Sequence, residues 1–170
     1  MNDAHLHLVL NHFPIIGSIF GLVILIAGLI LKNNSVKNTA YILFMVSAIF
    51  AAFSIGTGEG AEEMVEDMPN IGKQIIHEHE EIAEKFALVL YLMAAVSLAG
   101  LIMNLKNYSK AKFVSYVAVV IAIIAVVVST QVGTSGGEIR HTEIRDDSVN
   151  TKVLPEGSIS KEQTKEDDEK

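Results

Sequence analysis

The sequence predicts an all-α integral membrane protein: a four-helix bundle with a short extra-membrane helix and a disordered acidic tail. Half of the 170 residues are hydrophobic and the mean hydropathy is positive, which is unusual for a soluble domain of this size. The apolar residues gather in four uncharged runs at residues 13–31, 39–56, 86–105 and 113–130. About 17–25 apolar residues suffice for a helix to cross a membrane, and none of the runs alternates as barrel strands do. We therefore expect one transmembrane domain over residues 1–145, followed by a polar tail over residues 146–170.

The first run is expected to be a permanent helix rather than a signal peptide. No Lys or Arg precedes it, and its apolar stretch is longer than that of a signal peptide. Pro14 leaves its beginning open. It could start the helix, with residues 1–13 as a loop, or it could kink a longer helix, which membrane helices tolerate.

The long middle segment is expected to hold a short surface helix and the start of the third helix. "GTGEG" is expected to end the second helix, and residues 59–68 are expected to form the short helix, ending near Pro69. Pro69 and Gly72 are the expected starting signals of the third helix. "GTSGGE", after the fourth run, is expected to be another terminating turn.

The lysines predict the orientation of the bundle. The two short connections contain Lys32, Lys37, Lys106, Lys110 and Lys112 and no acid, whereas residues 57–85 contain nine acids and two lysines. Because Lys and Arg accumulate in cytoplasmic loops, both short connections are expected inside and both termini outside. All six histidines then lie on the outer side of the membrane.

Helix geometry brings one of these histidines, His12, to the same level as residues of other helices. Counted outward from the lysine boundaries at about 1.5 Å per residue, His12, Glu59 and Phe86 lie at the outer edge of the hydrocarbon. Ile75, His79, Ile82 and Phe86 form one helical stripe, so His79 is expected to face inward. His77 belongs to a charged stripe and is expected to face water.

These residues could bind a transition metal or a b-type haem. Neutral imidazole is a common metal ligand and haem axial ligand, and carboxylates can join it. The candidate ligands are His12, His79 and His141, with Glu59 and Glu62 beside them; His5 and His7 are further possibilities. The alternative is that the histidines only pack, cap helices and bind water.

Several function classes are disfavoured. The absence of cysteine excludes thiolate metal sites and covalent c-type haem. No charged residue lies within an apolar run, which argues against a pump, channel or ion-coupled transporter. We find no nucleotide-binding glycine loop, and no nucleic-acid partner is expected.

Three segments together resemble an uncharacterised family of small bacterial four-helix membrane proteins, known only as a domain of unknown function. These are "HLHLVLNHFPI", "TGEGAEEMVEDMPNI" with "HEHEEIAEKFA", and "TSGGEIRHTEIR". The His-Phe-Pro and Gly-Gly-x-Ile-Arg-His motifs carry most of the resemblance. It implies a multi-pass protein of a bacterial plasma membrane and singles out the same residues, but it implies no activity.

The sequence identifies no reaction. One hypothesis is a His/Glu cluster that holds a metal or haem in support of respiratory redox chemistry. The competing hypotheses are a cofactor-free structural or accessory subunit of a membrane complex, a homo-oligomer included, and a periplasmic sensor of pH or metal.

Overall fold

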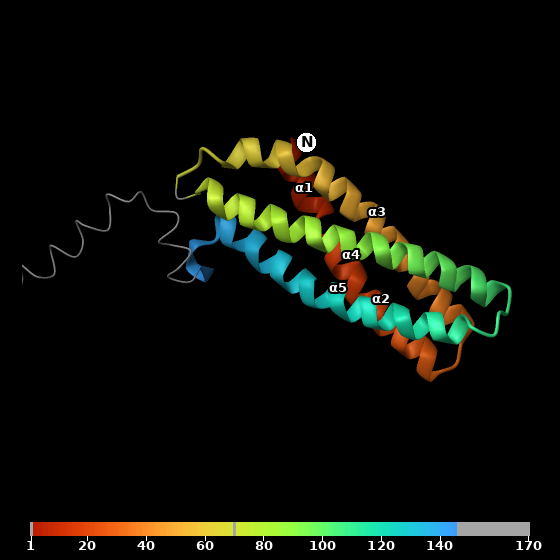
Figure 1. Cartoon of the computed structure of the whole chain (residues 1–170). Coiled ribbons are helices and arrows are strands. Elements are labelled where there is room, and N and C mark those ends of the chain that lie inside the picture. Colours follow the sequence, from red (N-terminus) through yellow and green to blue (C-terminus); the bar gives the residue numbers. More distant parts are fainter. Residues whose placement is uncertain (1, 70, 146–170) are drawn as a thin grey trace, which may run out of the picture.

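Four long helices run side by side and antiparallel (Figure 1). The computed structural model describes residues 2–69 and 71–145, and the predicted tail, residues 146–170, lies outside the described residues. The elements are α1 (Asp3–Leu10), α2 (His12–Ile30), α3 (Asn34–Val65), α4 (Lys73–Leu105), α5 (Ala111–Arg140) and the 3-10 helix η1 (Thr142–Ile144). The predicted all-α four-helix bundle is confirmed.

The helices have the length and composition of membrane spans. Four stretches are long and apolar enough to cross a membrane, and α1 and α2 together count as one of them, of 28 residues. Large apolar side chains also cover the outside of the bundle: Phe20, Leu88 and Phe113 are each more than half exposed. A lipid bilayer satisfies such a surface and water does not. The chain is therefore built as a multi-pass membrane protein.

The core depends on small residues that let large ones fit between the helices. α2 packs on α3, α3 on α4 and α4 on α5, and α2 against α5 closes the ring. Tyr41 and Phe44 of α3 are fully buried. A Cβ on Gly100 of α4 would lie 2.6 Å from Cζ of Tyr41, and one on Gly21 of α2 would overlap the ring of Phe44. These glycines are sites of close packing, as is common between membrane helices.

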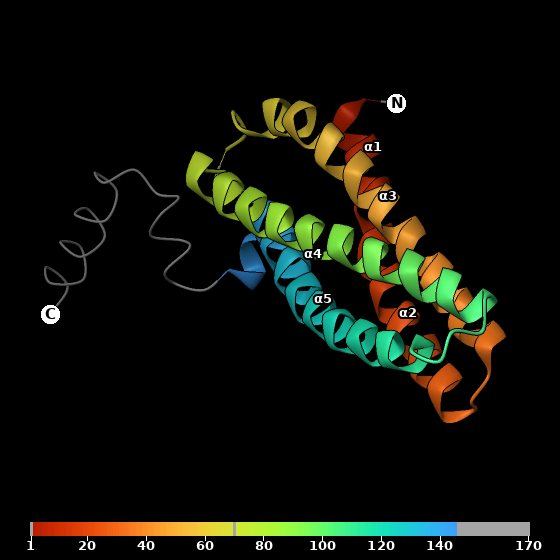
Figure 2. The same cartoon turned by 45° about the vertical axis from the view of Figure 1, so that its right-hand side comes forward.

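The two ends of the bundle differ in chemistry. One end, here called the lysine end, holds the α2–α3 and α4–α5 connections (Figures 1 and 2). The other, here called the histidine end, holds α1, the α3–α4 connection and the end of α5. At about 1.5 Å per residue, the 33 residues of α4 extend about 50 Å, well beyond a hydrocarbon layer of about 30 Å. We take the four apolar runs as the membrane-spanning segments, so the remaining turns at the histidine end lie outside them.

Two predicted helix ends are wrong. The "GTGEG" segment does not end a helix, because α3 continues through it to Val65 and includes most of the expected surface helix at residues 59–68. "GTSGGE" likewise lies within α5, which continues to Arg140. Contacts made by these glycine-rich helical segments, described below, offset the low helix propensity of glycine. The short helix outside the apolar runs is α1 instead.

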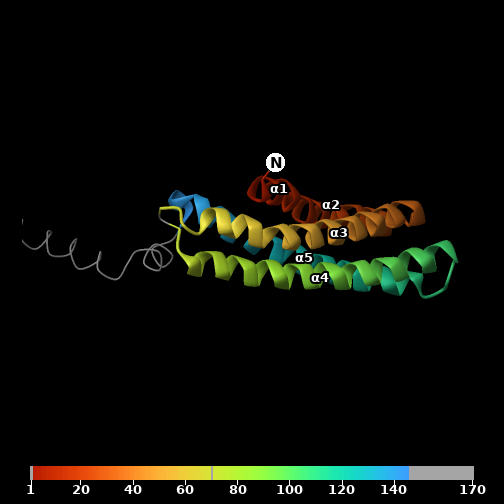
Figure 3. The ribbon, with the colours of Figure 1, turned by 90° about the horizontal axis from the view of Figure 1, so that it is seen from above.

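The chain before Pro14 is helical rather than a loop. α1 begins after Asn2, whose side chain accepts a hydrogen bond from the backbone N–H of His5 at 2.9 Å. The helix is interrupted at Asn11, because Pro14 lacks the N–H that would continue the hydrogen bonding into α1. α1 lies against α3 (Figure 3), which brings its histidines over the bundle.

Candidate functional site

All six histidines lie at the histidine end, but only two of them are enclosed by other helices. These two are His7 of α1 and His79 of α4. His5, His12, His77 and His141 are exposed. The predicted inward orientation of His79 and outward orientation of His77 are both confirmed.

His79 is held between α4 and α5. It lies on the same face of α4 as Ile75 and Phe86, and both of these residues are buried. This face of α4 therefore points into the bundle. Its Nδ1 lies 2.9 Å from Oγ of Ser135, and that hydroxyl donates to the carbonyl of Val132 at 3.3 Å. A hydroxyl can donate or accept, so this contact fixes the orientation of the ring rather than its tautomer.

His7 is held between α1 and α3. Its Nδ1 lies 3.0 Å from the carbonyl oxygen of Ser54 and 3.2 Å from Oγ1 of Thr57. A carbonyl oxygen can only accept, so Nδ1–H of His7 donates.

The two imidazoles are oriented in the same way. Each places Nδ1 within hydrogen-bond distance of an oxygen of the neighbouring helix, and for His7 the carbonyl partner leaves the lone pair on Nε2. Among residues 2–69 and 71–145, neither Nε2 has a hydrogen-bond partner. An imidazole oriented through Nδ1–H with a free Nε2 is the usual arrangement of a metal-binding histidine.

The two glycine-rich helical segments lie beside these rings, and Gly136 makes room for one of them. A Cβ on Gly136 of α5 would lie 3.0 Å from Cε1 of His79, and one on Gly58 of α3 would lie 3.9 Å from Cε1 of His7. The "GTSGGE" segment thus supplies both the hydrogen-bond partner of His79, Ser135, and the space beside it. Any side chain at Gly136 would press on the imidazole.

Both histidines favour the neutral form. The pKa of His79 is lowered to about 4. Burial is the main cause, and the charge of His7 is the second. Burial also lowers the pKa of His7, although its hydrogen bond to the Ser54 carbonyl acts in the opposite direction. The influence of His7 on His79 places the two rings close enough for their charges to interact. Neutral imidazoles are the form that binds metals.

The other predicted histidines have different surroundings. His12 donates from Nδ1 to the carbonyl of Leu8 at 2.7 Å, within its own helical segment, and its ring is exposed. His141 lies beyond the end of α5 and pairs with Glu143, with 2.8 Å between Nδ1 and Oε1. No contact in the described part of the chain joins either residue to His79.

The predicted glutamates do not contact the histidine pair. Glu59 is exposed on α3. Glu62 hydrogen-bonds Glu80 of α4, and burial together with that bond raises the pKa of Glu80. A raised pKa allows the two carboxyl groups to share a proton and so to join α3 to α4. Nearby, Lys73 and Glu66 form an ion pair at 2.8 Å across the α3–α4 connection.

No group of three or more His, Asp or Glu side chains that could hold a metal ion is found within the described ranges. What the structure brings together is a pair, His7 and His79, of which the sequence singled out only His79. The half-buried residues Ala4, His7 and Asn11 of the first segment repeat at helical spacing. That spacing could have identified His7, had Pro14 not left open whether residues 1–13 form a helix.

His7 joins α1 to α3, and His79 joins α4 to α5. Comparisons of the chain with protein-family models, with curated proteins and with solved structures found no match. The motif resemblance noted above is therefore not supported by a family match. What the histidine end does must be inferred from its geometry.

Proposed function

We propose that the protein binds a transition metal ion at the histidine end, through Nε2 of His7 and of His79. The observation that carries this proposal is the shared orientation: each Nδ1 is engaged by an oxygen of a neighbouring helix, and neither Nε2 has a hydrogen-bond partner in the described part of the chain. Imidazole nitrogen suits zinc, copper, iron and nickel. A site with two protein ligands leaves further coordination positions for small molecules, which is what redox or sensing chemistry at a membrane surface needs.

The residues around the pair have supporting roles in this proposal. Ser54, Thr57 and Ser135 orient the imidazoles. His12, His141, Glu59 and Glu62 remain predicted as additional ligands, because all four belong to the same end of the bundle.

A b-type haem is the other cofactor that these histidines could hold, as axial ligands. The small residues that could have left space for a macrocycle fit it poorly. Gly17, Gly21, Gly28 and Gly100 all lie against side chains or backbone of neighbouring helices. This packing favours an ion over a haem within the apolar part of the bundle.

A cofactor-free accessory subunit is the second candidate function. It is favoured by the fact that the Nδ1 bonds of His7 and His79 already join α1 to α3 and α4 to α5. Under this hypothesis the histidines only stabilise the packing. A pH sensor working near neutrality is disfavoured, because a pKa of about 4 keeps His79 neutral there.

Metal binding by purified, detergent-solubilised protein tests the proposal. The protein is stripped with a chelator, titrated with Zn²⁺ or Cu⁺, and assayed for tightly bound metal. We expect His79→Ala to abolish binding and His77→Ala, two residues away on the same helix but exposed, to leave it unchanged. Ser135→Ala keeps the ligand but loses its orienting partner, so binding should weaken about 10–100-fold.

Equal binding by wild type, His79→Ala and His77→Ala would contradict the proposal. An absorption spectrum of the same samples, oxidised and reduced, identifies haem by its Soret band. A folded wild type that binds neither metal nor haem would favour the accessory subunit.

A further inference from the structure

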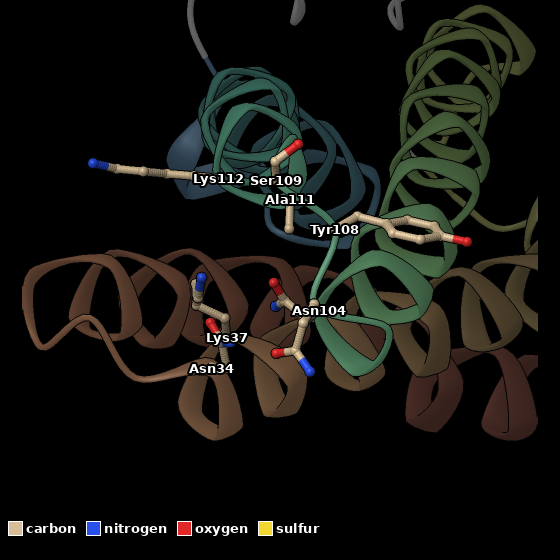
Figure 4. Close-up of a pocket in the computed structure, with 8 residues that line it drawn as sticks. Asn34, Lys37, Asn104, Tyr108, Ser109, Ala111 and Lys112 are labelled. Carbon is tan, nitrogen blue, oxygen red and sulfur yellow. The ribbon is translucent and has the colours of Figure 1, made fainter.

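The lysine end contains a pocket whose chemistry differs from that of the histidine end. Its volume is about 230 Å³, and the start of α3, the α4–α5 connection and the start of α5 enclose it (Figure 4). Lysine, asparagine, serine and tyrosine side chains line it, and no carboxylate does. Such a lining offers hydrogen-bond donors and positive charge.

Lys37 is the central residue of this pocket. It is only 7% exposed, and in the described part of the chain its side chain has no ion-pair or hydrogen-bond partner. Its stem packs against α2, where a Cβ on Gly28 would lie 2.7 Å from Cγ of Lys37. In Figure 4 its amino group points from α3 toward the start of α5. The stem of Lys37 is therefore buried, while its ammonium is accessible from the pocket. An ammonium with no carboxylate beside it favours the binding of an anion.

Three further features strengthen the positive character of the pocket. Lys112 of α5 also lines it, and its charge repels that of Lys37. The Lys112 ammonium lies 5.8 Å from the ring centre of Tyr116, a weak contact from which a flexible lysine can turn toward the pocket. The first turns of both α3 and α5 border the pocket, and α5 has no side-chain cap. The positive ends of their helix dipoles favour a negative charge.

Asn104 also lines the pocket and is 4% exposed. Its amide nitrogen donates to Asn38 at 3.0 Å, and its Oδ1 is buried out of reach of the pocket, with no partner in the described part of the chain. A bound molecule therefore meets the lysines and the other polar groups of the lining rather than this oxygen.

The depth of the pocket corresponds to the headgroup region of a bilayer. Lys37 comes two residues before the apolar run 39–56, and Lys112 comes directly before the run 113–130. At about 1.5 Å per residue, both lie within a few ångströms of the hydrocarbon boundary. Basic pockets between helices at this level bind the headgroups of anionic lipids.

We propose that this pocket binds a phosphate group, as carried by an anionic glycerophospholipid headgroup or by free inorganic phosphate. Lys37 is the main contact and Lys112 a second cation. The site is separate from the histidine pair and does not depend on the proposed metal.

Lipid binding to the full chain in detergent tests this proposal. Native mass spectrometry measures binding of phosphatidylglycerol and of zwitterionic phosphatidylcholine. We expect wild type to prefer phosphatidylglycerol by about tenfold or more, and Lys37→Met to lose that preference. Lys110→Met is the matched control, because Lys110 lies at the same end of the bundle, two residues before Lys112, but does not line the pocket. Lys112→Met should weaken the preference and gives a second test if Lys37→Met fails to fold.

Competition with inorganic phosphate distinguishes the two sources. If millimolar phosphate displaces phosphatidylglycerol from wild type, the site takes the free ion; if it does not, the site takes the lipid headgroup. Either result upholds a phosphate site provided that Lys37→Met lowers the binding. Equal phosphatidylglycerol binding by wild type, Lys37→Met and Lys112→Met, or no preference over phosphatidylcholine in wild type, would overturn the proposal.

Discussion

Replacing His79 with Gln should remove a pH dependence of stability that the buried imidazole imposes. The pKa of His79 falls from the ordinary value of 6.5 to about 4, with burial as the main cause. At 1.36 kcal/mol per pKa unit, this difference corresponds to roughly 3 kcal/mol at most. Because the unfolded chain takes up the proton more readily than the folded chain, acid favours unfolding. The stability contribution is complete above about pH 6.5 and is lost as the pH falls toward 4.

The assay is thermal unfolding in detergent with a chelator present, followed by circular dichroism from pH 7 to pH 4. For a chain of this size, roughly 3 kcal/mol corresponds to a fall of about 6–12 °C in Tm. The pKa of His7 is also lowered and that of Glu80 is raised, so the informative quantity is the difference between variants. We expect His79→Gln to lose less Tm over this range than wild type does.

His77→Gln is the control, because His77 is exposed on the same helix. Its Tm should fall with pH as that of wild type does. If His79→Gln and wild type lose the same Tm between pH 7 and pH 4, then the imidazole is not buried and neutral as described. The proposed ligand geometry would then be wrong as well.

Three other substitutions test the packing. Tyr41→Phe removes the 2.8 Å hydrogen bond from the Tyr41 hydroxyl to Ser115, and should lower the free energy of unfolding by about 0.6 kcal/mol, measured by chemical denaturation in mixed micelles. Gly21→Leu forces a side chain into Phe44 and should cost about 1–3 kcal/mol or more, seen as a lower Tm; an unchanged Tm would refute the close contact. Arg145→Ala removes hydrogen bonds of 2.6 and 2.8 Å to carbonyls in the last turn of α5, and should speed amide exchange there about tenfold without affecting the middle of the helix.

The sequence predicted the spans well because the bilayer imposes a length and an apolar composition that can be read directly. The beginning of α4 was also predictable, since Gly72 precedes Lys73 and the stripe from Ile75 to Phe86 has helical spacing. The ends of α3 and α5 were not. Glycine disfavours a helix by about 1 kcal/mol, but here Gly136 admits the imidazole of His79 and Gly60 admits the side chain of Asp3, and these tertiary contacts outweigh propensity.

The candidate site was only partly predictable for a related reason. Counting along each helix gave a common level for His12 and Glu59, but level alone does not bring side chains together. The direction of each ring decides that: His12 bonds to its own helical segment, whereas His7 and His79 bond to neighbouring helices. The pocket around Lys37 could not be predicted either, because the lysines of the short connections were informative only about orientation.

Elemental analysis of protein isolated from membranes without added metal tests the central claim most directly, with an absorption spectrum on the same sample. The account predicts metal at about one ion per chain, or a haem band, in wild type and in the His77→Ala control. It predicts loss of that signal in the His7→Ala, His79→Ala double variant. A folded wild type free of metal and haem, or a double variant that retains the full signal, would contradict it.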